Sequence, residues 1–392
     1  MIPTHPLKAF FLTFVLVIVT LGPVKANELS GLTELSSVKM PVLTHLETIS
    51  LSGETTGNVG SLSFSPNVQY LAILINNSHN RAVDIIIWDL KNRREQARVE
   101  NLPIFAFPLM KIRWSPDSNV ITLGTGVAWQ PTVFWSAMTG KVVHQLDSGA
   151  LHASGGEFNK NGTEYLVNMT GLLSPTYESG FRIYNTITWN FKDYGSDGLH
   201  IQALTWTSDG KVFMVGFWPR PFVGRSIDGV TPRMSDTLAR LFDPTGVTQV
   251  RTVVLAHGTP DKKLPNVIHQ GPFKPYLMTK AAMANVVALG SGQVMAVDIQ
   301  KLEVLSVYDS ADAASKSRNL PDGFFGDNVA VSPDGQLVYL VGSVGQESLI
   351  ITAHGGEQVG RFPGADRGVA ISADGKYLAE GIGNRVELQN IN

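Results

Sequence analysis

Two histidines hold matching positions in a repeated sequence pattern, and imidazole is the side chain that binds metals and moves protons near neutral pH. His152 lies six residues before Phe158, and His200 lies six residues before Trp206. Similar positions in later repeats hold Asp327, Asp366 and Arg367. If these side chains converge on one opening, they could bind a metal ion or orient a small substrate. The alternative is that they cap turns and face water.

The sequence supplies no third strong ligand for such a metal site, which needs at least three donors. The matching positions elsewhere hold Asn58, Pro108 and Ala365. The chain has no cysteine, which excludes thiol nucleophiles and zinc-thiolate sites. It also lacks four sequence patterns of known sites: the nucleophile elbow G-x-S-x-G, the metal-binding pair H-E-x-x-H, the EF-hand loop and the phosphate-binding G-x-x-x-x-G-K. We therefore expect no metal, no cofactor and no enzymatic activity.

A second set of candidates combines aromatic and arginine side chains in long connections. An insertion over residues 218–236 holds Trp218, Arg220, Phe222 and Arg225, and neighbouring long connections hold Trp129 and Tyr177. Such residues are enriched where proteins bind proteins, because they bury a large area with few rotatable bonds. We expect them to bind a protein or peptide. The alternative is that Trp218 and Phe222 fold back onto their own strands as a small satellite core.

The elements that position both sets are predicted from a recurring phrase, an apolar residue followed by a tight turn. The turn is occupied by Ser, by Pro, by Asn or Asp, and by Gly. Each of these residue types favours a backbone conformation found in tight turns, so every phrase predicts a hairpin. The phrases begin at Phe64, Trp114, Phe158, Trp206, Val331 and Ile371. Continuous apolar runs such as 71–75 follow the turns and predict strands buried on both faces.

A third strand and a more polar fourth strand complete each unit of about 40 to 50 residues, which is typical of a β-propeller blade. One further blade lacks the phrase but keeps readable strands at 285–289, 293–299 and 303–308. The sequence therefore predicts an all-β protein with one seven-bladed propeller over residues 27–392. Its approximate blades are 59–100, 109–147, 152–193, 200–256, 276–308, 327–362 and 367–392.

The last repeat supplies only three strands, and the segment 43–51 reads as a strand with no hairpin partner. We expect this N-terminal strand to complete the last blade, since that removes two exposed sheet edges and closes the ring.

These repeats resemble the WD-repeat family over nearly the whole predicted domain. Trp88-Asp89 stands where that family has its Trp-Asp pair, and the Ser-Pro-Asp-Gly phrases stand at its inner hairpins. The family's Gly-His pair is absent at its usual spacing, so its buried hydrogen-bond network is not transferred. A divergent bacterial WD-like or YVTN-like propeller fits the pattern. Because no catalytic motif is found and the insertion carries residues typical of protein interfaces, we expect a non-enzymatic binding or scaffold role. The alternative is a propeller enzyme of the lactonase or quinoprotein-dehydrogenase kind, with its site at the mouth of the central channel and with His152 and His200 involved.

The N-terminus reads as a signal peptide over residues 1–26. Lys8 precedes the apolar run Ala9–Leu21, which is shorter than the ~20 residues that span a bilayer, and Val24-Lys25-Ala26 fits the cleavage rule. We expect a periplasmic or secreted protein without a membrane span after cleavage. The formal net charge of −2 provides no basic surface for nucleic acid, so that class of partner is excluded.

Overall fold

All described residues belong to one compact unit, Met40–Asn392. The computed structural model describes residues 41–51, 57–77, 82–102, 111–124, 132–146, 152–170, 179–218, 225–233, 236–247, 250–257, 277–291, 293–309, 328–341, 347–362 and 368–392. The predicted signal peptide lies outside these residues and stays a prediction.

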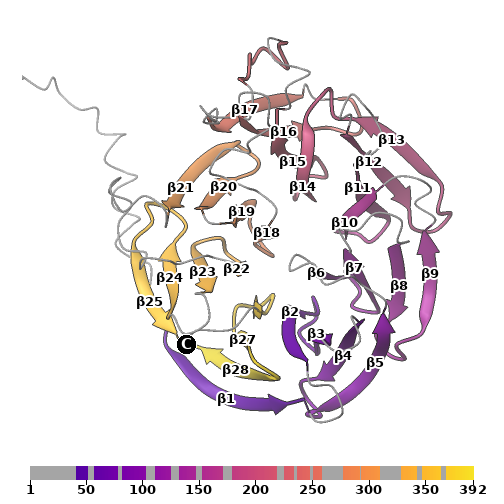
Figure 1. Ribbon diagram of the computed structural model, residues 1–392, viewed down its shortest axis with the longest axis vertical. Helices are drawn as coiled ribbons and strands as arrows, with labels where there is room; N and C mark the ends of the chain where they lie inside the picture. Colours follow the sequence, from indigo (N-terminus) through magenta and orange to yellow (C-terminus); the bar gives the residue numbers. More distant parts are fainter. Residues whose placement is uncertain are drawn as a thin grey trace, which may run out of the picture. The chain divides into compact units, whose positions relative to one another are not determined.

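This unit consists of seven antiparallel sheets with four strands each (Figure 1). Blade 1 comprises β2 (Asn58–Phe64), β3 (Tyr70–Asn77), β4 (Ala82–Asp89) and β5 (Arg94–Leu102). Blade 2 comprises β6 (Lys111–Trp114), β7 (Val120–Gly124), β8 (Thr132–Ser136) and β9 (Val142–Leu146). Blade 3 comprises β10 (His152–Phe158), β11 (Glu164–Thr170), β12 (Ser179–Asn185) and β13 (Phe191–Gly195). Blade 4 comprises β14 (His200–Trp206), β15 (Val212–Phe217), β16 (Thr237–Phe242) and β17 (Arg251–Ala256). Blade 5 comprises β18 (Leu277–Lys280), β19 (Val286–Ser291), β20 (Gln293–Asp298) and β21 (Glu303–Asp309). Blade 6 comprises β22 (Asn328–Val331), β23 (Leu337–Val341), β24 (Ser348–Thr352) and β25 (Gln358–Phe362). Blade 7 comprises β26 (Gly368–Ile371), β27 (Tyr377–Ile382), β28 (Arg385–Ile391) and β1 (Leu43–Ser50).

The sheets are arranged in a closed ring with the first strand of each blade innermost (Figure 1). Along the sequence β2, β6, β10, β14, β18, β22 and β26 each contact the next, and β26 contacts β2. No helix occurs among the described residues, and none of them forms a helical segment long and apolar enough to cross a membrane. The predicted all-β, seven-bladed propeller is confirmed.

The N-terminal strand closes the last blade as predicted. β1 pairs antiparallel with β28, from Leu43 opposite Ile391 to Ser50 opposite Arg385. Beyond the strand ends, Val42 and Asn392 exchange two backbone hydrogen bonds of 3.1 and 3.0 Å. The two ends of the propeller therefore share one sheet, and the ring has no open edge at this point.

The recurring phrase forms the same hydrogen-bonded turn in several blades. In blade 1 the Ser65 hydroxyl donates to Asn67 Oδ1 at 2.7 Å and accepts the backbone N–H of Tyr70 at 2.9 Å. The same pair of bonds is made from Ser115, Ser332 and Ser372, and a close variant from Thr207. One side chain thus fixes both ends of the turn, which explains why the phrase recurs.

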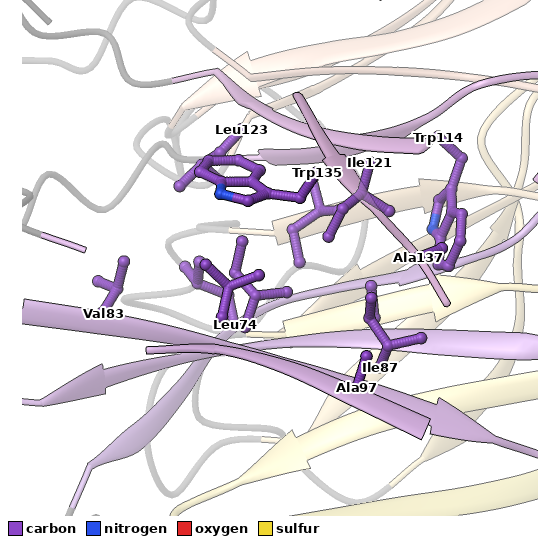
Figure 2. Close-up of a cluster of buried hydrophobic side chains, with 13 residues drawn as sticks. Leu74, Val83, Ile87, Ala97, Trp114, Ile121, Leu123, Trp135 and Ala137 are labelled. Atoms are coloured by element: carbon purple, nitrogen blue, oxygen red, sulfur yellow. The ribbon is translucent and has the colours of Figure 1, made fainter. Parts of the chain in front are cut away.

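Each central strand is buried on both faces because neighbouring blades pack against it. In β3, Leu74 belongs to the cluster between blades 1 and 2, whereas the adjacent Ile73 belongs to the cluster between blades 7 and 1. Figure 2 shows the first cluster, in which blade 2 contributes Trp114, Ile121 and Trp135. The continuous apolar runs in the sequence reflect this two-sided burial.

The closure gives a direct prediction for β1. Ile49 is 1% exposed and packs with residues of blades 1 and 7, whereas Leu46 on the same strand is 36% exposed. Ile49→Ala should lower the free energy of unfolding by about 2–5 kcal/mol, because it leaves a cavity at the closing blade. Leu46→Ala should cost about 0.5 kcal/mol or less. Denaturant titration of both variants measures the difference.

Deletion of residues 27–53 should lower the melting temperature far more than removal of an ordinary tail, because it opens the ring. An unchanged melting temperature in the deletion, or equal effects of the two alanine variants, would contradict the closure.

Candidate functional site

The structure does not describe the side chains of most of the residues predicted to converge on the mouth of the central channel. Asp327, Asp366 and Arg367 are outside the described residues. His152 is the first residue of β10 and His200 is the first residue of β14, so the two histidines hold matching backbone positions in blades 3 and 4. The structure describes the side chain of His200 alone.

His200 is half-buried between neighbouring residues. Its ring centroid lies 4.5 Å from that of Phe217, and Nδ1 lies 3.3 Å from the Ser179 hydroxyl oxygen. Burial lowers the pKa of the imidazole, so it is neutral at pH 7. Among the described residues no group of three or more histidine, aspartate or glutamate side chains could hold a metal ion. The contacts of His200 are those of a packed, hydrogen-bonded ring.

The insertion of blade 4 carries the predicted protein-binding residues, and its two ends are described. Trp129, Tyr177, Arg220 and Phe222 lie outside the described residues. Trp218 is 1% exposed and packs in a cluster with residues such as Leu199, Ile201 and Leu238. The structure thus corrects the expectation of a surface contact at Trp218, because its indole is buried in the core between blades 3 and 4, where Phe181 and Ile183 of blade 3 also pack. The satellite-core alternative for Phe222 lies outside the described residues. Arg225 is exposed.

A buried arginine fixes the stem of this insertion. Arg240 on β16 is 2% exposed, and its guanidinium donates to Asp228 Oδ2 at 2.9 Å, to Asp197 Oδ2 at 2.6 Å and to the Ser196 carbonyl at 3.0 Å. Burial raises the pKa of Asp228, but the hydrogen bonds from Arg240 and Thr252 outweigh this effect and hold the pKa below its usual value. Residues 225–233 form the stem of the insertion and contain the bridge between Ile227 and Val230. This stem is therefore held to blade 4 by charge-assisted hydrogen bonds.

The described residues also form a pocket that the sequence reasoning missed, at the seam between blades 2 and 3. Its volume is about 250 Å³. The seam pocket is lined by Ser115, Pro116, Asp117, Val120, Phe134, Val143, His144, Phe158, Asn161, Gly162, Thr186 and Trp189. The floor is aromatic, since Phe134 lies 5.8 Å from Phe158 between ring centroids and 4.9 Å from the buried Tyr165.

One wall of the seam pocket is a stacked pair from two blades. The rings of His144 on β9 and Trp189 are nearly parallel, with centroids 3.7 Å apart. Burial lowers the pKa of His144, so this wall is uncharged at pH 7. At the lip, burial raises the pKa of Asp117, but hydrogen bonds from Ser115 and Asn119 outweigh it and keep this carboxylate ionised. The pocket therefore combines aromatic and aliphatic side chains with polar ones such as Asn161 and Thr186, and it has a single negative charge, on Asp117.

Trp189 holds this position in a strained backbone conformation. Its φ is +57°, a region that bulky residues avoid at a cost of about 1–2 kcal/mol. It donates its N–H to the carbonyl of Asn185, four residues earlier, as Gly140 does to Ser136 in blade 2. Blade 3 thus places a tryptophan where blade 2 has a glycine with φ of +67°. The matching positions in blades 1 and 5 hold Arg93 and Leu302 with φ of +51° and +59°, so the left-handed conformation belongs to this turn of the repeat, and what distinguishes blade 3 is the large aromatic side chain placed there.

Taken together, the fold defines the class of protein as a seven-bladed β-propeller. No known family model and no curated protein matches the sequence. Among solved structures, the chain is similar to the β-propeller domain of Cps50 (Swd1) from Myceliophteria thermophila, with a TM-score of 0.56 and 12% sequence identity. The likeness covers 90% of this chain and 100% of that domain, and at this identity it shows the fold alone.

The buried arginine gives a prediction for the insertion. Arg240→Met should destabilise the protein by about 3 kcal/mol, because it leaves two aspartates without their partner. Arg361→Met is the matched control, since Arg361 pairs with Glu347 at 2.6 Å but both side chains are more than half exposed. That variant should cost about 1 kcal/mol or less. Equal unfolding free energies in the two variants would show that Arg240 does not anchor the stem.

Proposed function

We propose that this protein is a non-enzymatic, protein-binding propeller, and that it holds an apolar side chain of its partner in the seam pocket. The observation that supports this function is the stacking of Trp189 on His144 beside an aromatic pocket that opens on exposed apolar residues. Val143 is 54% exposed and Ile187 is 80% exposed. Other exposed apolar residues of blades 2 and 3 are Met138, Val142 and Phe191.

This combination suits a protein partner better than a small polar ligand. Aromatic side chains dominate binding energy at protein interfaces, where a central pocket receives one anchor and the surrounding contacts exclude water. Exposed apolar residues next to such a pocket extend the contact area that a partner can bury. The carboxylate of Asp117 adds a negative charge that favours a basic or hydrogen-bond-donating residue beside the anchor.

The insertion of blade 4 is the second part of this proposal. Its stem is fixed by Arg240, so the segment that carries Arg220 and Phe222 starts and ends at set positions on blade 4. A rigid base lowers the entropy that a binding loop loses when its partner docks. We propose that this segment, with Arg225, makes further contacts with a protein.

The location and lineage belong to the proposal as well. The N-terminal pattern of Lys8, the apolar run and the cleavage motif supports export to the bacterial cell envelope or the extracellular space. The repeated turns and the Trp88-Asp89 pair support a divergent WD-like propeller. In this propeller the Trp88 indole nitrogen is buried without a hydrogen-bond partner among the described residues, while Asp89 accepts the backbone N–H groups of Lys91 and Asn92.

Peptide display against the purified protein tests the proposed function. Selection should enrich peptides that share one large apolar residue. Trp189→Gly and Val143→Asp should weaken the binding of these peptides by about tenfold or more, which corresponds to the loss of roughly 1.4 kcal/mol of contact energy. Melting temperatures should change little in Trp189→Gly, because relief of the backbone strain offsets the lost stacking.

Val247→Asp is the matched control. Val247 is 85% exposed in a turn of blade 4, away from the seam pocket, so this variant should bind the peptides like the wild type. Failure to enrich any peptide, or equal weakening in all three variants, would contradict the seam pocket as the binding site.

A further inference from the structure

Blade 7 buries a carboxyl group at a position that every other blade fills with an apolar side chain. Glu380 lies on β27 opposite Val369, which is two residues before the end of the innermost strand. In blades 1 to 6 the residues in this register are Ile73, Leu123, Val167, Met214, Leu289 and Leu340. All six are at most 2% exposed, and Glu380 is 0% exposed. An acid thus occupies a core position of the repeat.

The alternation of side chains along the strands shows which seam holds this acid. Ala379 and Tyr377 of β27 pack in the cluster between blades 7 and 1, so Glu380 points to the other face of the sheet, toward blade 6. In blade 6, Leu340 belongs to the cluster with blade 5, so the adjacent Tyr339 points toward blade 7. Tyr339 is 1% exposed. The carboxyl group therefore lies between blades 6 and 7 and is shielded from water.

The hydrogen bonds of Glu380 do not satisfy an ionised carboxylate. The side-chain amide of Gln389 on β28 donates to Oε2 at 2.5 Å, whereas Oε1 has no hydrogen-bond partner among the described residues. Burying a charge is costly unless the charge is paired and fully hydrogen-bonded. The neutral acid avoids most of this cost.

The charged groups on the two neighbouring strands also favour the neutral acid. On β28, Glu387 lies directly opposite Glu380 and accepts a hydrogen bond from Thr48 of β1 at 2.6 Å. Arg385 Nε lies 3.0 Å from Glu387 Oε1, and His45 Nδ1 lies 3.5 Å from Glu387 Oε2. The basic side chains of β28 and β1 therefore contact Glu387, and the negative charge of Glu387 disfavours a second one on Glu380.

The other elements around this seam supply no cation for the buried carboxyl among the described residues. The second acid of β1, Glu47, lies opposite Leu388 on the face toward blade 1. The described parts of β22, β24 and β26 have no ionisable side chain. In blade 6, burial raises the pKa of the Tyr339 hydroxyl, so this group stays neutral, and Arg361 of β25 pairs with Glu347 at 2.6 Å.

The resulting pKa makes the stability of the fold depend on pH. Burial, with a smaller contribution from the charge of Glu387, outweighs the bond from Gln389 and raises the pKa of Glu380 from 4.5 to about 8. Between these pH values the unfolded chain releases a proton that the folded chain keeps. Stability therefore falls as the pH rises from 4.5 to about 8, and above that range the loss through this group is complete.

We propose that Glu380 is a pH-dependent switch that controls how tightly blade 7 packs against blade 6. The neutral acid allows the two blades to pack, and the carboxylate draws water into the seam. Because β1 completes blade 7 by pairing with β28, the loosened seam includes the two ends of the propeller. The ring is then firmly closed in acidic and neutral surroundings and opens locally in alkaline ones.

Thermal unfolding of the wild type and of Glu380→Gln from pH 5 to pH 9 tests the switch. The two proteins should melt at nearly the same temperature at pH 5, where the acid is neutral when folded. At pH 9 the wild type should melt about 3 °C or more below the variant, because it alone buries a charge. Glu380→Leu, which restores the apolar residue of the repeat, should likewise show a smaller fall in melting temperature than the wild type.

Glu357→Gln is the matched control, since it removes a carboxylate from an exposed position between β24 and β25 of blade 6. Its melting temperature should follow that of the wild type at every pH. The same difference between the wild type and Glu380→Gln at pH 5 and pH 9, or identical melting curves of the two over the whole range, would overturn the proposal.

Hydrogen exchange locates the effect. At pH 9 the amides of β27 and β28 should exchange about threefold faster or more in the wild type than in Glu380→Gln, while those of β11 in blade 3 should exchange at equal rates. At pH 6 the two proteins should agree throughout. A difference of equal size in β11 and in β27 at pH 9 would contradict a switch confined to the closing blade.

Discussion

The structure depends on one constraint, the burial of both faces of every sheet. In β3, Ile73 and Leu74 point to opposite clusters, and both are at most 2% exposed. A sheet of this kind is stable only between two neighbours, so no blade can stand at an open end. The ring must close, and β1 closes it by pairing with β28. The seams between blades follow from that closure.

The contacts that we propose for binding lie where blades 3 and 4 differ from the other repeats. Blade 3 has Trp189 at the turn position that is Arg93 in blade 1 and Gly140 in blade 2, and its indole stacks on His144. Blade 4 carries an insertion whose stem is tied down by Arg240.

The sequence predicted those features that every blade repeats. Hairpin phrases such as the one at Ser65, two-sided strands such as 71–75, and the closing strand at 43–51 each leave a local pattern of turn residues or apolar residues. The burial of Trp218 was not predictable in this way, because an insertion has no periodicity that tells the core from the surface. The seam pocket combines residues from different blades, and their spacing depends on the twist and tilt of whole sheets. Trp189 stands in a turn where the preceding blade has glycine, but Arg93 and Leu302 hold the same position in other blades, so this difference alone did not mark the site.

Hydrogen exchange in the wild type and in Ile49→Asp tests the central claim, that closure of the ring stabilises the blades on both sides of it. Because β1 packs against residues of blades 7 and 1, we expect this variant to lose amide protection in β26 and β2 together, and more than in β10 of blade 3. Loss of protection confined to β1 and β28, with β26 and β2 protected as in the wild type, would contradict it.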